Sequence, residues 1–105
     1  MNEKIKTPEP YVKLMLNEAG YTHNIYGKSV LENSCGDGNI LCEIVERYIC
    51  DAEQHGIGHK ELKERLEKDI CGYEIDQEQA KQCRDRLDQV AESHGLEKVD
   101  WDIRQ

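Results

Sequence analysis

The stretch SVLENSCGDGNIL, residues 29–41, decides the fold of this chain. Its first part, 29–33, is a short run of β-prone residues that stops at two glycines, Gly36 and Gly38. From Asn39 onward the apolar residues recur as a doublet at every fourth position, a spacing that only a helix places on one face. These doublets are Ile40 with Leu41, Ile44 with Val45, and Tyr48 with Ile49. The stretch therefore predicts a strand, a glycine loop and a helix, in that order.

Strands and helices alternate along the rest of the chain as well. Strands that alternate with helices form parallel sheets through right-handed crossovers. We therefore expect an α/β fold of the doubly wound class, with three layers and about three parallel strands. The predicted elements are a helix begun by Thr7-Pro8 and ended by Gly20, the strand over 29–33, the helix from Asn39, a charged helix over 60–68, a strand over 69–75, a helix capped by Asp76 and ended by Gly95, and a strand over 99–103.

Composition limits the classes of protein that the chain can belong to. It has 105 residues, a net charge of −8, and no apolar run near the ~18 residues that a membrane span requires. The amino terminus lacks the apolar stretch of a signal peptide, and five cysteines without a C-x-x-C pair suit buried thiols, so we expect a cytoplasmic protein with no membrane contact. Nucleic-acid binders usually present a basic face, so any contact with DNA is expected to come from parts outside this chain.

The glycine loop predicts a ligand site at the carboxyl end of the first strand, because doubly wound sheets bind ligands there. A dinucleotide fingerprint needs a third glycine where this chain has Leu41, and no G-K-[ST] follows to make a P-loop. Glu32, just before the loop, would repel a pyrophosphate but suits a cationic, amino-bearing ligand such as S-adenosyl-L-methionine. At the end of the second strand, Glu74 is placed to accept both hydroxyls of an adenosyl ribose, with Ile75 along the adenine face.

These residues carry a resemblance. The Thr7-Pro8 pair, VLENSCGDGNIL at 30–41 and GYEID at 72–76 resemble the start of the bacterial N6-adenine DNA methyltransferases of restriction–modification systems. The resemblance implies a partial Rossmann-like methyltransferase fold in which Thr7 meets the methionine carboxylate, the loop holds the methionyl part and Glu74 binds ribose. Asn33 departs from the family, which usually has proline there. The cofactor-binding residues expected for S-adenosyl-L-methionine are Thr7, Glu32, Asn33, Ser34, Cys35, Gly36, Gly38, Glu74 and Ile75.

The catalytic motif of that family, [N/D/S]-P-P-[Y/F], is absent, since Pro8 and Pro10 are the only prolines. We therefore expect a single partial domain over 1–105, with a helix and linker over 1–28 and the cofactor-binding half over 29–105. Such a fragment would bind the methyl donor without methylating DNA alone. No catalytic residue is assigned, and no metal site is expected, because His55 and His59 lie in a glycine-rich turn without a cysteine at ligand spacing.

Two other classes of function stay open. One is a non-enzymatic, acidic interaction module that keeps a relic of the loop and pairs its open sheet edge with another chain or a second copy. The other is an NAD-binding half-domain. The interaction module predicts that Glu32→Ala and Glu74→Ala leave every interaction of the chain intact, and the NAD-binding half-domain predicts binding of NAD but not of S-adenosylmethionine.

Overall fold

The computed structural model describes residues 9–22, 24–32 and 36–104. Its three strands form one parallel sheet in the order β1-β2-β3, which confirms the expected α/β class with three parallel strands. Of the predicted site residues, Thr7, Asn33, Ser34 and Cys35 lie outside the described residues. The elements in chain order are α1 (Glu9–Glu18), β1 (Val30–Glu32), α2 (Asn39–Gln54), α3 (His59–Asp69), β2 (Ile70–Tyr73), α4 (Gln77–Ser93) and β3 (Asp102–Arg104).

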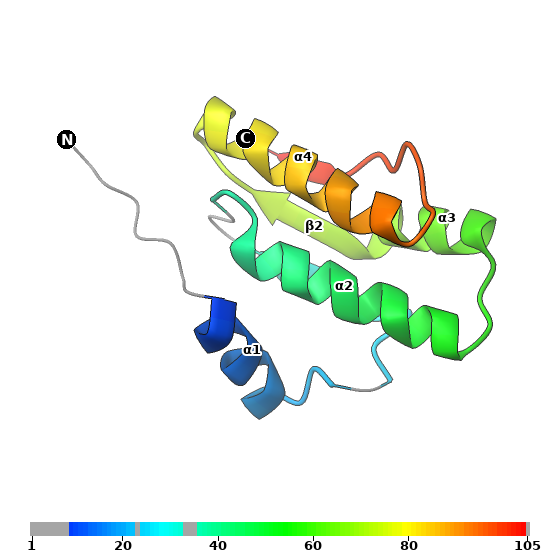
Figure 1. The fold of residues 1–105 in the computed structure, drawn as a ribbon. Helices are drawn as coiled ribbons and strands as arrows, with labels where there is room; N and C mark the ends of the chain where they lie inside the picture. The colour runs from blue at the N-terminus through cyan, green and yellow to red at the C-terminus, as the bar shows by residue number, and fades with distance from the viewer. Residues whose placement is uncertain (1–8, 23, 33–35, 105) are drawn as a thin grey trace.

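Helices α2 and α4 lie side by side over one face of the sheet, and α1 packs against α2 (Figure 1). Ile70 and Gly72 of β2 and Ile103 of β3 are buried on alternate positions, as expected for the strand face that the helices cover. The intervening positions are open, since Leu31 is 58% exposed and Tyr73 is 36% exposed. In the described part of the chain, a helix layer on the second face of the sheet is therefore not seen, and the doubly wound, three-layer arrangement stays a prediction.

The hydrophobic core fills the space between this sheet and the helices. It is mostly aliphatic, as the absence of Phe predicts, and Tyr48 and Trp101 are its large rings. Each ring has a polar partner, because the Tyr48 hydroxyl donates to Asp69 at 2.5 Å and the Trp101 indole donates to Asp88 at 2.7 Å. Buried Tyr and Trp need such partners to offset the loss of water.

The last strand is shorter than the alternation over 99–103 predicts. Val99 and Trp101 do point into the core, but β3 begins only at Asp102. In the ladder with β2, only Asp102, Ile103 and Arg104 are paired, with Cys71, Gly72 and Tyr73. The alternating pattern therefore reported burial correctly and strand length incorrectly.

Among the residues that the structure describes, none of the helices combines the length and the apolar character needed to cross a membrane. Among the described cysteines, the expectation of buried thiols holds for Cys83, whereas Cys42, Cys50 and Cys71 are half-buried.

Candidate functional site

The carboxyl ends of β1 and β2 lie side by side at one edge of the sheet. Glu32 is the last residue of β1 and aligns with Gly72 of β2, while Glu74 directly follows β2. The Gly36 N–H donates a hydrogen bond to Oε1 of Glu74 at 2.9 Å, across 38 positions of sequence. The glycine loop and the acid that follows the second strand therefore meet at this edge of the sheet.

Glu74 is a buried acid rather than a solvated strand end, with 3% of its surface exposed. Besides the Gly36 amide, its carboxylate accepts a hydrogen bond from the Asp76 N–H at 2.9 Å, and its own N–H donates to the Arg104 carbonyl at 2.8 Å. The side chain thus ties the glycine loop to the turn that begins α4. Ile75, next in sequence, is 88% exposed and presents an apolar surface beside this acid.

Glu32 has a different environment. Its side chain is half-buried at the end of β1, and burial raises the pKa of its carboxyl. No described residue forms a hydrogen bond or an ion pair with this carboxylate. A desolvated carboxylate without a donor is costly, so the site favours a ligand that brings a cation or N–H groups to it.

The two glycines of the loop are needed for different reasons. Both have a left-handed backbone, with φ of 58° at Gly36 and 92° at Gly38. A Cβ at Gly38 would lie 3.0 Å from Sγ and 3.3 Å from Cα of Cys83 on α4, whereas a Cβ at Gly36 would meet nothing within 4 Å. Gly38 therefore allows the loop to approach α4, and the space beside Gly36 is the part of the loop open to a ligand.

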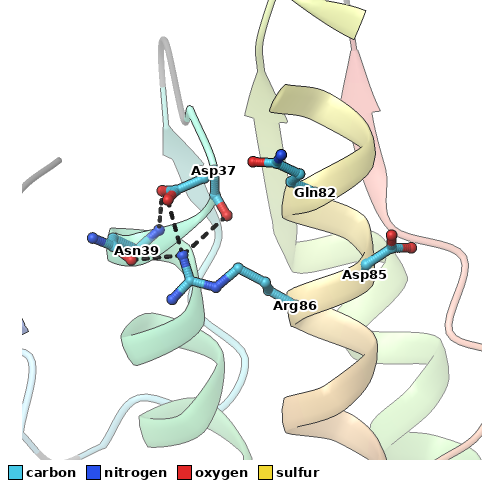
Figure 2. Close-up of a pocket in the computed structure, with 5 residues that line it drawn as sticks. All are labelled: Asp37, Asn39, Gln82, Asp85 and Arg86. Carbon is cyan, nitrogen blue, oxygen red and sulfur yellow. Dashed lines mark hydrogen bonds and ion pairs between the residues drawn. The ribbon is translucent and has the colours of Figure 1, made fainter. Parts of the chain in front are cut away.

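Arg86 of α4 binds the residues at the end of the glycine loop (Figure 2). Its Nη1 donates to Oδ1 of Asn39 at 2.6 Å and to the carbonyl of Asp37 at 3.4 Å, and it lies 3.2 Å from Oδ2 of Asp37. These residues, with Gln82 and Asp85, line a polar surface pocket of about 350 Å³. The sequence did not predict the role of Arg86 at the loop. Its position next to the buried Leu87, and three residues after Cys83, indicates only that it borders the core face of α4.

The arrangement as a whole is a parallel α/β sheet with an acid at the end of each of two neighbouring strands and a left-handed glycine loop between them. No protein-family model matches the chain, and no curated protein matches it.

Proposed function

We propose that this chain is the S-adenosylmethionine-binding part of a DNA adenine-N6 methyltransferase. The observation that carries the proposal is Glu32: a half-buried carboxylate without a described partner, at the carboxyl end of β1 and at the start of the glycine loop. A methionyl group offers this carboxylate an ammonium donor, and the neighbouring sulfonium adds a second positive charge. The cofactor, when bound, supplies an electrophilic methyl group.

The residues that follow β2 would hold the adenosyl part. Ribose hydroxyls can take the place of the Gly36 N–H as donors to the Glu74 carboxylate while the Asp76 N–H keeps its bond, because a carboxylate accepts up to about four hydrogen bonds. The exposed side chain of Ile75 offers an apolar surface for the adenine ring. On this account Glu74 exchanges partners on binding, so the loop at Gly36 changes its contacts while Gly38 stays packed on α4.

We also propose that further strands complete the sheet. Among the described strands, β1 pairs with β2 alone, so one of its edges carries unpaired backbone groups beside the exposed side chain of Leu31. Further strands of a doubly wound sheet would pair there, and their crossover helices would cover the open face. They would also have to bring the groups for base flipping and methyl transfer, since no [N/D/S]-P-P-[Y/F] motif is present in this chain.

Calorimetric titration of the folded chain with S-adenosylmethionine and with its demethylated product tests the proposal. We expect saturable binding of both, weakened roughly tenfold to a hundredfold in Glu32→Gln, since a charge-assisted hydrogen bond contributes about 1.5–3 kcal/mol. Glu97→Gln is the matched control, because Glu97 is an exposed acid far along the chain from the loop. If wild type, Glu97→Gln and Glu32→Gln all bind equally well, Glu32 is not part of the site.

The second candidate, an acidic interaction module, has one observation in its favour: the open edge of β1 with Leu31 58% exposed. It predicts that the folded chain gives no heat with S-adenosylmethionine or NAD but associates with itself at high concentration. Heat with NAD alone would instead favour the NAD-binding half-domain.

A further inference from the structure

A second cluster of polar side chains lies between α2 and α4, in the half of α2 that is farther from the glycine loop. Glu46, Cys50 and Glu53 share one face of α2, because their spacings of four and three residues are those of neighbours on a helix. His94 reaches them from the carboxyl-terminal cap of α4. Gly95, with φ of 81°, ends that helix directly after His94.

The side chains of this cluster are in direct contact. Nε2 of His94 lies 2.5 Å from Oε2 of Glu46, and the Cys50 thiol donates to the same oxygen at 3.4 Å. On the other side of the ring, Nδ1 of His94 lies 3.1 Å from Oε1 of Glu53. Three potential ligand atoms, one each from Glu46, Cys50 and His94, thus lie within 4.8 Å of one another.

A plain salt bridge accounts for part of this arrangement. Burial alone would lower the pKa of His94, but the hydrogen bonds and charges of Glu46 and Glu53 outweigh that effect and raise it. A protonated His94 between the two carboxylates still leaves one negative charge in excess, and the salt bridge gives no role to the Cys50 thiol. Burial and the hydrogen bond to Glu46 raise the pKa of that thiol to about 11.

We propose that Glu46, Cys50 and His94 bind a divalent transition metal ion of the zinc class. Carboxylate oxygen, thiolate sulfur and imidazole nitrogen are typical ligands of zinc in proteins, with bonds of about 2.0–2.3 Å. Small side-chain movements are enough to bring the three ligand atoms to these distances from one ion. The metal takes the place of two protons, one on Sγ of Cys50 and one on Nε2 of His94, and both pass to solvent. Three protein ligands leave a fourth position for water.

Glu53 holds the remaining ring N–H of His94. Ligating histidines typically donate their second N–H to a carboxylate, which fixes the tautomer and the orientation of the ring. Glu46 and Glu53 are 40% and 42% exposed, so a metal ion can reach the cluster from solvent without opening the fold. The site does not depend on the function proposed above, because it shares no residue with the glycine loop or with Glu74.

Cobalt titration of the reduced, full chain at about pH 8 tests the site, because Co²⁺ bound to a thiolate gives a charge-transfer band in the near ultraviolet. We expect the band to saturate at one equivalent, to disappear on adding Zn²⁺, and to be absent in Cys50→Ser. Cys71→Ser is the matched control, since Cys71 is another half-buried thiol but lies on the sheet, and it should keep the band.

Two further variants separate ligation from helix packing. Glu53→Gln keeps all three ligands and should weaken metal binding about tenfold or more, the usual cost of losing an outer partner. His94→Gln should abolish saturation at one equivalent while circular dichroism shows a folded chain. If folded wild type gives no band and melts at the same temperature with and without Zn²⁺, or if Cys50→Ser keeps the band, the cluster is a salt bridge only and the proposal fails.

Discussion

The molecule contains two strand–turn–helix units, β1 with α2 and β2 with α4, and the acids at the ends of their strands have opposite environments. Glu32 is the last residue of β1, and Glu74 directly follows β2. In the second unit Glu74 accepts backbone N–H groups, and Asp76 caps α4 by accepting from the N–H groups of Glu78 and Gln79 at 3.0 and 3.1 Å. In the first unit Glu32 has no described partner, and the cap residue of α2, Gly38, offers no side chain.

The difference indicates which of the two acids stabilises the fold of the unbound chain and which one lacks a partner until a ligand supplies it. Buried polar groups that are satisfied within the chain add to stability, and those left unsatisfied cost free energy until something binds them. Substitutions in the second unit should therefore destabilise the protein, while removal of the Glu32 charge in the first unit should stabilise it.

The largest effect is expected at the point where the two units touch. Gly38→Ala forces a left-handed alanine, which costs about 1–2 kcal/mol, and also pushes its Cβ into Cys83, which adds about 1–3 kcal/mol. Gly36→Ala has the same kind of backbone strain with open space beside it, so it isolates the first cost. Urea unfolding should show Gly38→Ala to be clearly the less stable of the two, and equal losses would contradict the packing of the loop on α4.

Glu74→Gln comes next. The amide keeps one acceptor oxygen and turns an NH₂ group toward a backbone N–H of Gly36 or Asp76, leaving a buried donor without an acceptor. We expect the free energy of unfolding to fall by about 1–3 kcal/mol, measured by urea unfolding near neutral pH. A variant as stable as wild type would show that Glu74 does not tie the loop to the start of α4.

Asp76→Ala removes the cap of α4 and should cost about 1 kcal/mol. Asp85→Ala on the same helix is its control, because the exposed ion pair of Asp85 with Lys81 should contribute no more than a few tenths of a kcal/mol. Thermal unfolding of the two variants side by side measures the difference. Equal melting temperatures would mean that the cap does not stabilise the second unit.

Glu32→Gln is expected to have the smallest effect on stability and the opposite sign. Burial raises the folded-state pKa of Glu32 above its unfolded value, so the stabilising effect of the protonated form is full below the unfolded pKa and is lost as the pH rises through the folded one. At neutral pH the ionised carboxylate therefore destabilises the folded chain, and the neutral amide of Gln removes this destabilisation. Glu32→Gln should melt slightly above wild type near neutral pH, and the gain should vanish in acid below the unfolded pKa of about 4.3.

The sequence was informative where a pattern reflects local chemistry. The doublets of α2 predicted its buried face, and the carboxylate of Asp76 predicted the start of α4, as the structure confirms. It was uninformative about contacts between distant segments: Arg86 reaches Asn39 across 47 positions, and His94 reaches Glu46 across 48. Such pairs are brought together by the packing of α4 on α2, which no spacing within one helix encodes.

The same limit applies to the role of the glycines. Their left-handed turn can be anticipated from the sequence, since an alternation of glycines after a strand is typical of such loops. That Gly38 serves the close approach of Cys83 rather than of a ligand depends on where α4 lies, and only the folded chain shows it.

The central claim, that the ligand binds at Glu32, the glycine loop and the residues directly after β2 while the cap of α4 stays in place, is tested most directly by amide chemical shifts on adding S-adenosylmethionine to the isotope-labelled chain. The account predicts large shifts at Glu32, Gly36 and Ile75, with the Gly36 amide moving most because it exchanges its hydrogen bond to Glu74. It predicts little change at Glu78 and Gln79, whose amides stay bonded to Asp76. Shifts confined to other parts of the chain, or none at saturating cofactor, would contradict it.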